Sequence, residues 1–369
     1  MKRILLVTIL DNYNIGTFLQ AFASVKLLQK SGNVVTLLRY VRSNETCFLN
    51  AWYKYDKKKL LLRLPLCIIQ CMYNYFFRSR FISFLYRYNI PMTKRVVGIE
   101  GAKRFGSLYD TYVVGSDQVW NFSHNKGLDE TFFLDFVTNT DVLKYSLSSS
   151  MGTYDIGDNK NYIRDKLSSF NKISVREKTA RDYLLSIGLN KVEWLIDPTL
   201  VINKTEWLDY MDSINFSYPT EPFLLVYSVE PQQKLIEYYA KQLASKLNLK
   251  IARVSATLSL KRSSIYDFTY DCASPEQFIS LFDKANFIIA SSFHGTAFSI
   301  NFHKQFVTIT PNKFSSRIDS LLSLFKLEDR KIVDYQTSIE TLLNTIDYNK
   351  IDSILKSERK KTNLYISQI

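Results

Sequence analysis

Residues 4–40 read ILLVTILDNYNIGTFLQAFASVKLLQKSGNVVTLLRY, and this stretch decides the fold. It opens with a continuous apolar run over 4–10, as expected of a central parallel strand that is covered on both faces. A polar turn at 11–16 follows, and apolar residues then recur at helical spacing over 17–30. A second apolar run, 34–40, completes a β-α-β unit, so the chain begins as a parallel α/β domain.

The same alternation continues along the chain. In the first half we expect strands at 112–115, 131–136, 144–150, 172–175 and 192–196, and helices at 162–170 and from 176 to about 188. A polar stretch punctuated by Pro198 and Pro219 follows. The second half has expected strands at 223–227, 250–254, 287–290 and 306–310, and helices at 232–247, 275–285, from about 295, and 316–325.

Two successive alternations predict two Rossmann-like domains, 1–205 and 206–345, that face a central cleft, with a helical tail at 346–369. In parallel sheets of this kind, ligands bind beyond the carboxyl ends of the strands. Each polar segment that we single out below lies at such a strand end.

The pattern breaks in a helical insertion at about 45–105. Its central part, 51–90, mixes three consecutive lysines with long aliphatic and aromatic runs, which is typical of a segment that lies in a membrane interface. Arg63 and Pro65 interrupt the apolar run, so it does not read as a spanning helix. A helical subdomain that packs on the first sheet is the other interpretation.

Net charge and composition limit the kinds of partner and the compartment that we expect for this protein. The net charge of +13 favours anionic partners, but the chain has no basic tail and no nucleic-acid-binding motif, so we expect no nucleic acid. The four cysteines have no zinc-type pairing with the three histidines, which predicts buried thiols and a reducing compartment. Asp11 follows the N-terminal apolar run without a small-residue cleavage site, so we expect a cytoplasmic protein.

The segment YDTYVVGSDQVWN, residues 109–121, brings polar groups to the end of an apolar strand. Gly115 permits close backbone approach, Ser116 and Gln118 offer neutral hydrogen bonds, and Asp117 offers a carboxylate. A helix cap made by Ser116 or Asp117 is the competing interpretation.

The segment FIIASSFHGTAFSINF, residues 287–302, is a buried strand that leads into a helix. Free backbone N–H groups at Ser292, Gly295 and Thr296 would favour an anion such as phosphate or carboxylate. The same helix start keeps the imidazole of His294 neutral until an anion arrives, which suits a proton-transfer residue. A purely structural histidine is the alternative.

Cations follow two other strands. Arg176, at the end of strand 172–175, could grip a carboxylate or phosphate through two hydrogen bonds. Lys313 and Arg317 form a similar pair after strand 306–310. A surface salt bridge is the alternative interpretation for Arg176, and exposed residues on a helix surface are the alternative for Lys313 and Arg317.

Six segments, in this order, resemble the motifs of the polysaccharide pyruvyl transferase family. They are NYNIGTFLQAFAS (12–24), YDTYVVGSDQVWN (109–121), KYSLSSSMG (144–152), ISVREK (173–178), IDPTLV (196–201) and SSFHGTAFSI (291–300). The resemblance covers roughly residues 3–330. It departs at Ser292, because well-studied members carry an arginine two positions before the motif histidine.

The resemblance implies a GT-B-like glycosyltransferase architecture. It also implies transfer of a pyruvyl group from phosphoenolpyruvate onto a pair of sugar hydroxyls, forming a ketal on a bacterial capsular polysaccharide, an exopolysaccharide or a lipid-linked precursor. No cofactor is implied, and no Asp-x-Asp cluster argues for a metal. A lipid-linked acceptor would suit contact with the inner face of the membrane.

These expectations give each candidate residue a role. His294 is the predicted acid and base, and Asp117 the carboxylate that activates or binds the sugar hydroxyl. Arg176 and the helix start at 292–296 would hold the donor, with Lys313 and Arg317, in the second domain.

The first loop would face the acceptor from the opposite domain, through Asn14, Gly16 and Gln20. Two other functions remain: a glycosyltransferase of the same architecture that uses a nucleotide sugar, and a non-catalytic protein of a polysaccharide pathway.

Overall fold

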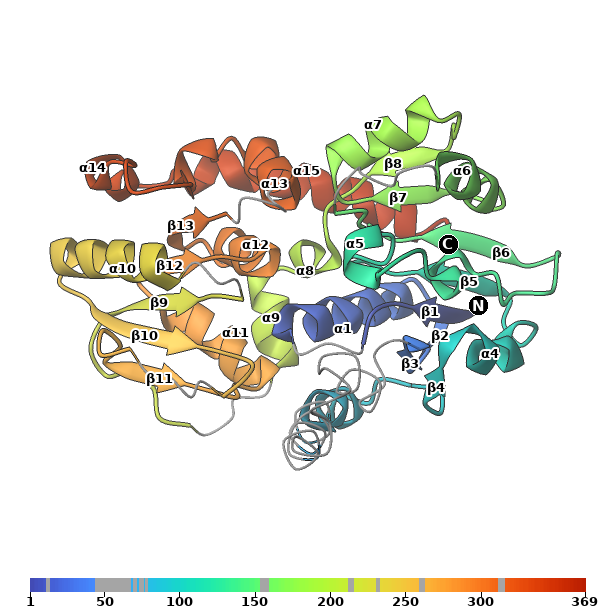
Figure 1. Ribbon diagram of the computed structural model, residues 1–369, viewed down its shortest axis with the longest axis horizontal. Coiled ribbons are helices and arrows are strands. Elements are labelled where there is room, and N and C mark those ends of the chain that lie inside the picture. Colours follow the sequence, from blue (N-terminus) through green and yellow to red (C-terminus); the bar gives the residue numbers. More distant parts are fainter. Residues whose placement is uncertain are drawn as a thin grey trace, which may run out of the picture.

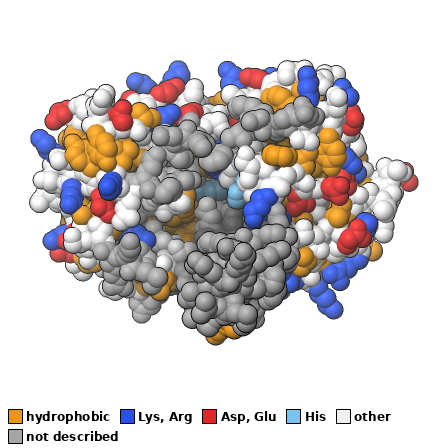
Figure 2. Space-filling model, in the orientation of Figure 1, with side chains coloured by type: hydrophobic (Ala, Val, Ile, Leu, Met, Phe, Trp, Pro, Cys, Tyr) orange, Lys and Arg blue, Asp and Glu red, His pale blue; other side chains and the backbone are white. Residues whose placement is uncertain are grey.

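Two parallel sheets with helices around them form the two halves of the protein (Figure 1). The computed structural model describes residues 1–10, 14–43, 68, 72, 76, 79–152, 159–211, 216–229, 233–258, 263–310 and 316–369. Figure 2 shows the same view in space-filling form, with lysine and arginine side chains exposed on both halves. The two parallel sheets confirm the prediction of two parallel α/β domains.

The first sheet has the order β2-β1-β5-β6, and all of its pairs are parallel. Its strands are β1 (Arg3–Val7), β2 (Val34–Leu37), β5 (Thr111–Val114) and β6 (Leu143–Ser146). Strands β7 (Ile173–Val175) and β8 (Val192–Trp194) pair with each other and join β6 through isolated bridges. A short pair, β3 (Tyr40–Val41) and β4 (Val96–Val97), lies apart.

The second sheet has six parallel strands in the order β11-β10-β9-β12-β13-β14. They are β9 (Phe223–Tyr227), β10 (Lys250–Val254), β11 (Phe268–Tyr270), β12 (Phe287–Ala290), β13 (Gln305–Ile309) and β14 (Lys331–Ile332). The sequence did not predict β11 and β14, which are short strands at the two edges.

Helices connect the strands of both halves. Those of the first half are α1 (Ile15–Lys30), α4 (Gly98–Ala102), α5 (Phe122–Asn125), α6 (Lys160–Ser168), α7 (Lys178–Ser186), α8 (Pro198–Val201) and α9 (Lys204–Tyr210). Those of the second half are α10 (Gln233–Leu247), α11 (Pro275–Lys284), α12 (Phe293–Asn301), α13 (Ser316–Phe325), α14 (Ile339–Leu343) and α15 (Tyr348–Ile366).

One predicted strand, 131–136, is wrong. The structure has a 3-10 helix at Glu130–Phe133, which the side chain of Asp129 caps by accepting a hydrogen bond from the amide of Thr131. Phe132 and Phe133 are both buried. Two adjacent buried residues fit a turn that packs on one side, but they contradict the alternation of a half-buried strand.

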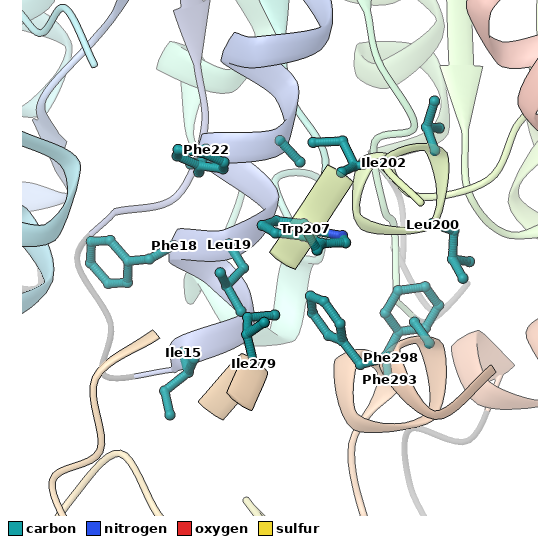
Figure 3. Packing of buried hydrophobic residues seen from close by; sticks show 14 of the residues in the cluster. Ile15, Phe18, Leu19, Phe22, Leu200, Ile202, Trp207, Ile279, Phe293 and Phe298 are labelled. Carbon is teal, nitrogen blue, oxygen red and sulfur yellow. The ribbon is translucent and has the colours of Figure 1, made fainter. Parts of the chain in front are cut away.

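Helix α1 is the centre of the junction between the halves. Nearly all of its residues from Ile15 to Leu28 are buried, because it packs against helices of both domains. Phe22 of this helix faces an apolar core, with its ring centroid 5.8 Å from that of Trp207, whereas Phe18 points away from Trp207 (Figure 3). Trp207 of α9 and Phe298 of α12 lie in the same core, with ring centroids 5.4 Å apart. Apolar side chains therefore fill this part of the junction.

Helix α15 ties the end of the chain back to the first domain (Figure 1). The guanidinium of Arg359 donates hydrogen bonds to the carbonyl of Leu200 and to the side chain of Asn301, 2.9 and 2.7 Å away. Near the end of the helix, the hydroxyl of Tyr365 donates to the carbonyl of Ser146 at 2.8 Å. The predicted tail is thus a helix that spans both halves.

Most of the predicted insertion segment, 51–90, lies outside the described residues. Residues 79–87 are helical, and Phe81 stacks on Phe18 of α1 at 4.7 Å between ring centroids. This part packs on helix α1 of the first domain and also contacts the second domain, through the ion pair of Arg87 with Glu276. Among the helices in the described ranges, none combines the length and apolarity needed to cross a membrane.

Candidate active site

The end of strand β5 carries a strained acidic residue. Asp117 has φ of 75°, a conformation that side chains other than glycine rarely adopt and that recurs at functional sites. Its backbone carbonyl accepts hydrogen bonds from the amides of Val119 and Ser150. The hydroxyl of Thr17 in α1 donates to its carboxylate at 2.7 Å. The first helix and the strand end therefore fix this carboxylate together.

Arg176, at the end of β7, lies in the middle of the site with no exposed side-chain surface. Its Nη1 is 2.8 Å from Oδ2 of Asp197, and its Nη2 is 3.5 Å from Oδ1 of Asp117. Its guanidinium also covers the ring of Phe293 at 4.2 Å. The arginine thus joins two carboxylates of the first domain to the first residue of α12 in the second.

Asp197 completes this cluster and caps helix α8. Its Oδ1 accepts hydrogen bonds from the amide and the hydroxyl of Thr199, at 2.9 and 2.7 Å. Its Oδ2 accepts from the hydroxyl of Ser116 at 2.7 Å. Sequence reasoning assigned Asp197 no role in the site. The signal was present, because it belongs to the segment IDPTLV and directly follows a strand and its loop.

The imidazole of His294 reaches this cluster from the second domain. It lies in the first turn of α12 and is only 3% exposed. Its Nε2 is 3.9 Å from Oδ2 of Asp197 and has no hydrogen-bond partner among the described residues. His294 is therefore buried, but it is buried beside carboxylates.

Two glycines allow close packing around His294, Gly16 between the two domains and Gly295 within the second domain. A Cβ on Gly16, in the first turn of α1, would lie 2.3 Å from Cγ of His294. A Cβ on Gly295 would lie 2.9 Å from the ring of Tyr227. The hydroxyl of Tyr227 in turn donates to Asn14, which caps α1. The imidazole consequently lies against the starts of two helices.

The surroundings of these side chains lower the pKa of the imidazole and of both carboxyl groups. Burial lowers the pKa of the His294 imidazole, and the neighbouring Asp197 and Asp117 only partly oppose this effect. Burial would raise the pKa of Asp117, but Arg176 and His294 hold it well below its usual range. The pKa of Asp197 is also lowered, because His294 and Arg176 outweigh its burial. At neutral pH we therefore expect a neutral imidazole beside two ionised carboxylates.

The sequence model for polysaccharide pyruvyl transferases matches residues 14–313. The chain belongs to the polysaccharide pyruvyl transferase family. No curated protein sequence matches it.

Solved structures with the same fold include two UDP-GlcNAc 2-epimerases. The enzyme from Methanocaldococcus jannaschii is 10% identical, with a TM-score of 0.55 over 96% of this chain and 92% of its own. The enzyme from Neisseria meningitidis, bound to UDP-GlcNAc, is 11% identical, with a TM-score of 0.50 over 98% of this chain and 94% of its own. These similarities show the GT-B-like architecture.

The start of helix α12, residues 292–296, is the segment that we expected to bind an anion. The side chain of Ser292 caps α12 by accepting a hydrogen bond from the amide of Gly295 at 3.0 Å. Thr296 is fully buried, and its hydroxyl donates to the carbonyl of Ser292 and contacts Thr308. The amide of Gly295, which we expected to be available to an anion, therefore already donates to the side chain of Ser292.

The remaining predicted residues lie in different surroundings. Gln20 is fully buried and donates to Thr8, so it does not face an acceptor as expected. Gln118 is half-buried and accepts a hydrogen bond from Asn121, and Gly115 is buried against Thr8 and Leu6 of the β1 region. Arg317 starts helix α13. Lys313 lies outside the described residues.

Glu177 was also missed by sequence reasoning. It is buried next to Arg176, 3.5 Å from its Nε, and it accepts a hydrogen bond from the hydroxyl of Ser150. Burial raises the pKa of its carboxyl despite the nearby Arg176. Within the described ranges, no group of three histidine, cysteine or acidic residues is arranged to hold a metal ion. The guanidinium of Arg176 occupies the place between the carboxylates.

Proposed function

We propose that this protein transfers the pyruvyl group of phosphoenolpyruvate onto two hydroxyls of a sugar, forming a ketal. The family match supports a transferase that acts on polysaccharide. The observation that carries the finer proposal is the imidazole of His294, 3.9 Å from Asp197 in a buried site between two domains, where burial lowers its pKa. A buried base that carboxylates can stabilise once it is protonated suits the movement of protons between hydroxyl and carbon.

The reaction balances with two proton transfers. One sugar hydroxyl attacks C2 of phosphoenolpyruvate and loses its proton, while C3 gains a proton and becomes a methyl group. The C2–O bond to phosphate then breaks, and the second hydroxyl closes the ketal. Its proton leaves with the phosphate. In this scheme His294 takes up a proton as the donor binds, delivers that proton to C3, and then accepts the proton of the attacking hydroxyl.

The two aspartates serve this imidazole. Asp117 accepts from Thr17 and pairs with Arg176, and its low pKa makes it a weak base. We therefore assign to Asp117 and Asp197 the stabilisation of the imidazolium ion that forms during transfer. Arg176 positions both carboxylates, since its guanidinium is already paired with them.

The anionic donor needs a cation beyond Arg176. Arg317 is in the first turn of α13, and its charge acts on both Glu177 and His294. Helix α13 meets the first domain here, where the hydroxyl of Ser316 donates to the carbonyl of Gly152. We propose that Arg317 and the starts of α12 and α13 bind the phosphate and carboxylate of the donor.

Replacement of His294 by alanine tests the proposal. Phosphate release from phosphoenolpyruvate, with a saccharide acceptor, should fall by about a hundred- to ten-thousand-fold, the usual contribution of a general acid–base group. His303→Ala is the matched control, because His303 lies on the surface, 46% exposed and paired with Asp352. Turnover near the wild-type rate in His294→Ala would end the catalytic role.

The rival function is a transferase that uses a nucleotide sugar. It has the fold similarity alone in its favour. Thermal stability should rise with phosphoenolpyruvate and not with a panel of uridine and guanosine nucleotides. The opposite result would favour the rival. A pyruvylated product found by mass spectrometry would dismiss a non-catalytic protein.

We also propose a lipid-linked precursor of a surface polysaccharide as the acceptor, reached at the cytoplasmic face of the membrane. Ile68, Met72 and Phe76 are helical, four residues apart, and 53%, 67% and 60% exposed. Apolar side chains in such a row can enter the headgroup region of a membrane. Their replacement by serine should reduce co-sedimentation with anionic liposomes, whereas Leu364→Ser, at an equally exposed site on α15, should not. Equal losses would contradict the proposal.

A further inference from the structure

A cavity lies away from the His294 cluster. It has a volume of about 170 Å³ and lies between the helical residues 79–87 and the start of α11. Ala256, Ala273 and Ser274 line it just beyond the carboxyl ends of β10 and β11. This edge of a parallel sheet is the usual place for a ligand.

The cavity contains a buried carboxylate with unused bonding capacity. Glu276, in the first turn of α11, has no exposed surface and lines the cavity. One of its oxygens, Oε1, pairs with Nη1 of Arg87 at 2.6 Å. The other, Oε2, has no hydrogen-bond partner among the described residues. A buried carboxylate oxygen is costly unless a donor reaches it, so the cavity suits a ligand with hydroxyl groups.

Other walls of the cavity specify the rest of the ligand. The rings of Phe81 and Phe84 line it and offer apolar surface to the C–H groups of a sugar ring. A cavity of about 150 Å³ can hold one six-membered ring, which matches its size. Arg80 and Arg87 together carry more charge than Glu276 balances. The surplus positive charge fits an anionic substituent on that ring.

We propose that this cavity binds one hexose unit that bears a carboxylate or phosphate group. Its hydroxyls hydrogen-bond to Glu276, and its anionic group lies near Arg80. Assignment of this unit to the acceptor saccharide rests on the proposed function.

Helix α1 separates this cavity from the catalytic cluster. Gly16 contacts His294, whereas Phe18 stacks on Phe81 at the cavity. Residues two apart lie about 200° apart around a helix, so the two sites are on opposite sides of α1. A helix with its side chains is about 10 Å thick, so one sugar ring cannot reach both sites. The unit in the cavity is therefore a neighbour of the one that receives the pyruvyl group.

Binding to the intact protein tests the cavity without any transfer reaction. Glucuronate, glucose 6-phosphate and glucose are the probes, measured by saturation-transfer NMR and calorimetry in the absence of phosphoenolpyruvate. We expect at least one anionic hexose to bind more tightly than glucose. The better of the two anionic probes identifies the substituent as carboxylate or phosphate.

Three variants locate the binding. Glu276→Gln keeps the shape of the side chain and should weaken binding about tenfold or more, the value of a hydrogen bond to a charged group. Ser83→Trp, at an exposed position on the cavity wall, should block it. Asp283→Asn is the control. Asp283 lies on α11, as Glu276 does, but its ion pair with Lys204 of α9 is outside the cavity.

The outcomes separate this inference from the proposed function. If no anionic hexose binds, or if Glu276→Gln and Ser83→Trp bind like the wild type, the inference is overturned. If the probes bind as expected but the wild type releases no phosphate from phosphoenolpyruvate, the cavity stands and the proposed function fails.

Discussion

Replacement of Asp197 measures how much the buried ion cluster contributes to stability. Its side chain has no exposed surface and pairs with Arg176 at 2.8 Å. It also accepts from Ser116 and, as the cap of α8, from Thr199. Asparagine keeps the shape and the cap but removes the charge opposite the guanidinium. Alanine removes the cap as well.

The expected costs follow from these contacts. Breaking a buried ion pair from one side costs about 3–5 kcal/mol when the remaining charge is left uncompensated. Asp117 still faces Arg176 at 3.5 Å in Asp197→Asn, so we expect a loss in the free energy of unfolding that approaches but does not exceed this range. Loss of an aspartate cap costs about 1 kcal/mol, so Asp197→Ala should be less stable than Asp197→Asn by roughly this amount.

Urea denaturation of both variants, followed by circular dichroism, is the assay. Asp165→Asn is the control, because Asp165 and Arg164 form a surface pair that is about half exposed, and such pairs contribute about 1 kcal/mol or less. An Asp197→Asn variant that loses no more stability than this control would refute the reasoning about the buried charge. Equal stability of the two Asp197 variants would refute the capping argument.

Three further changes follow from the same structure. Gly16→Ala should cost about 1–3 kcal/mol by overpacking against the His294 ring, and much less in a His294→Ala background; equal costs in the two backgrounds would contradict the contact. The folded-state pKa of His294 lies below its unfolded value of about 6.5, so the unfolded state binds its proton first. Tm should therefore fall as pH drops through about 6.5, and His294→Ala should flatten this part of the plot of Tm against pH. The same plot for the variant and the wild type would contradict a lowered pKa of His294. Phe22→Ala should lose about 3–5 kcal/mol of unfolding free energy, whereas Leu364→Ala, at a site 62% exposed, should lose about 0.5 kcal/mol or less in the same titration.

Much of the architecture could be predicted from apolar patterns alone. Strands β9, β10 and β12 have the predicted bounds, because each is a short apolar run between clear breaks. Helix α13 also begins and ends as predicted, at Ser316 and Phe325. Strands covered on both faces leave a strong signal in the sequence, since nearly every residue in them is apolar.

The missed elements lacked that signal. Strand β11 is half-buried along its whole length, and β14 has two residues that pair only with β13. Their extended conformation comes from pairing with a neighbouring strand, which is distant in the sequence. Local pattern cannot show such pairing.

The sequence predicted only part of the site, because it shows which residues follow strands but not which of them meet in the folded protein. Spacing placed Asp117, Arg176 and His294 at strand ends, and the structure brings them together. It could not show that Arg176 would be enclosed by Asp197 and Glu177, because these contacts depend on how the sheets meet. Nor could it show that Gly16 lies against the imidazole, since that contact joins residues from the two domains.

The charges of the cluster set a condition on donor binding. Asp117 and Asp197 face Arg176. The positive charge of Arg317 also acts on the site, and burial lowers the pKa of the His294 imidazole. The charges of the two aspartates and the two arginines therefore balance, so the site has no surplus positive charge for the carboxylate and phosphate groups of the donor, and burial increases the cost of this lack. Protonation of His294 supplies one positive charge and the proton that C3 of phosphoenolpyruvate requires. Donor binding should therefore take up a proton, visible as a buffer-dependent enthalpy in calorimetry; a buffer-independent enthalpy would mean that the imidazole stays neutral when the donor arrives.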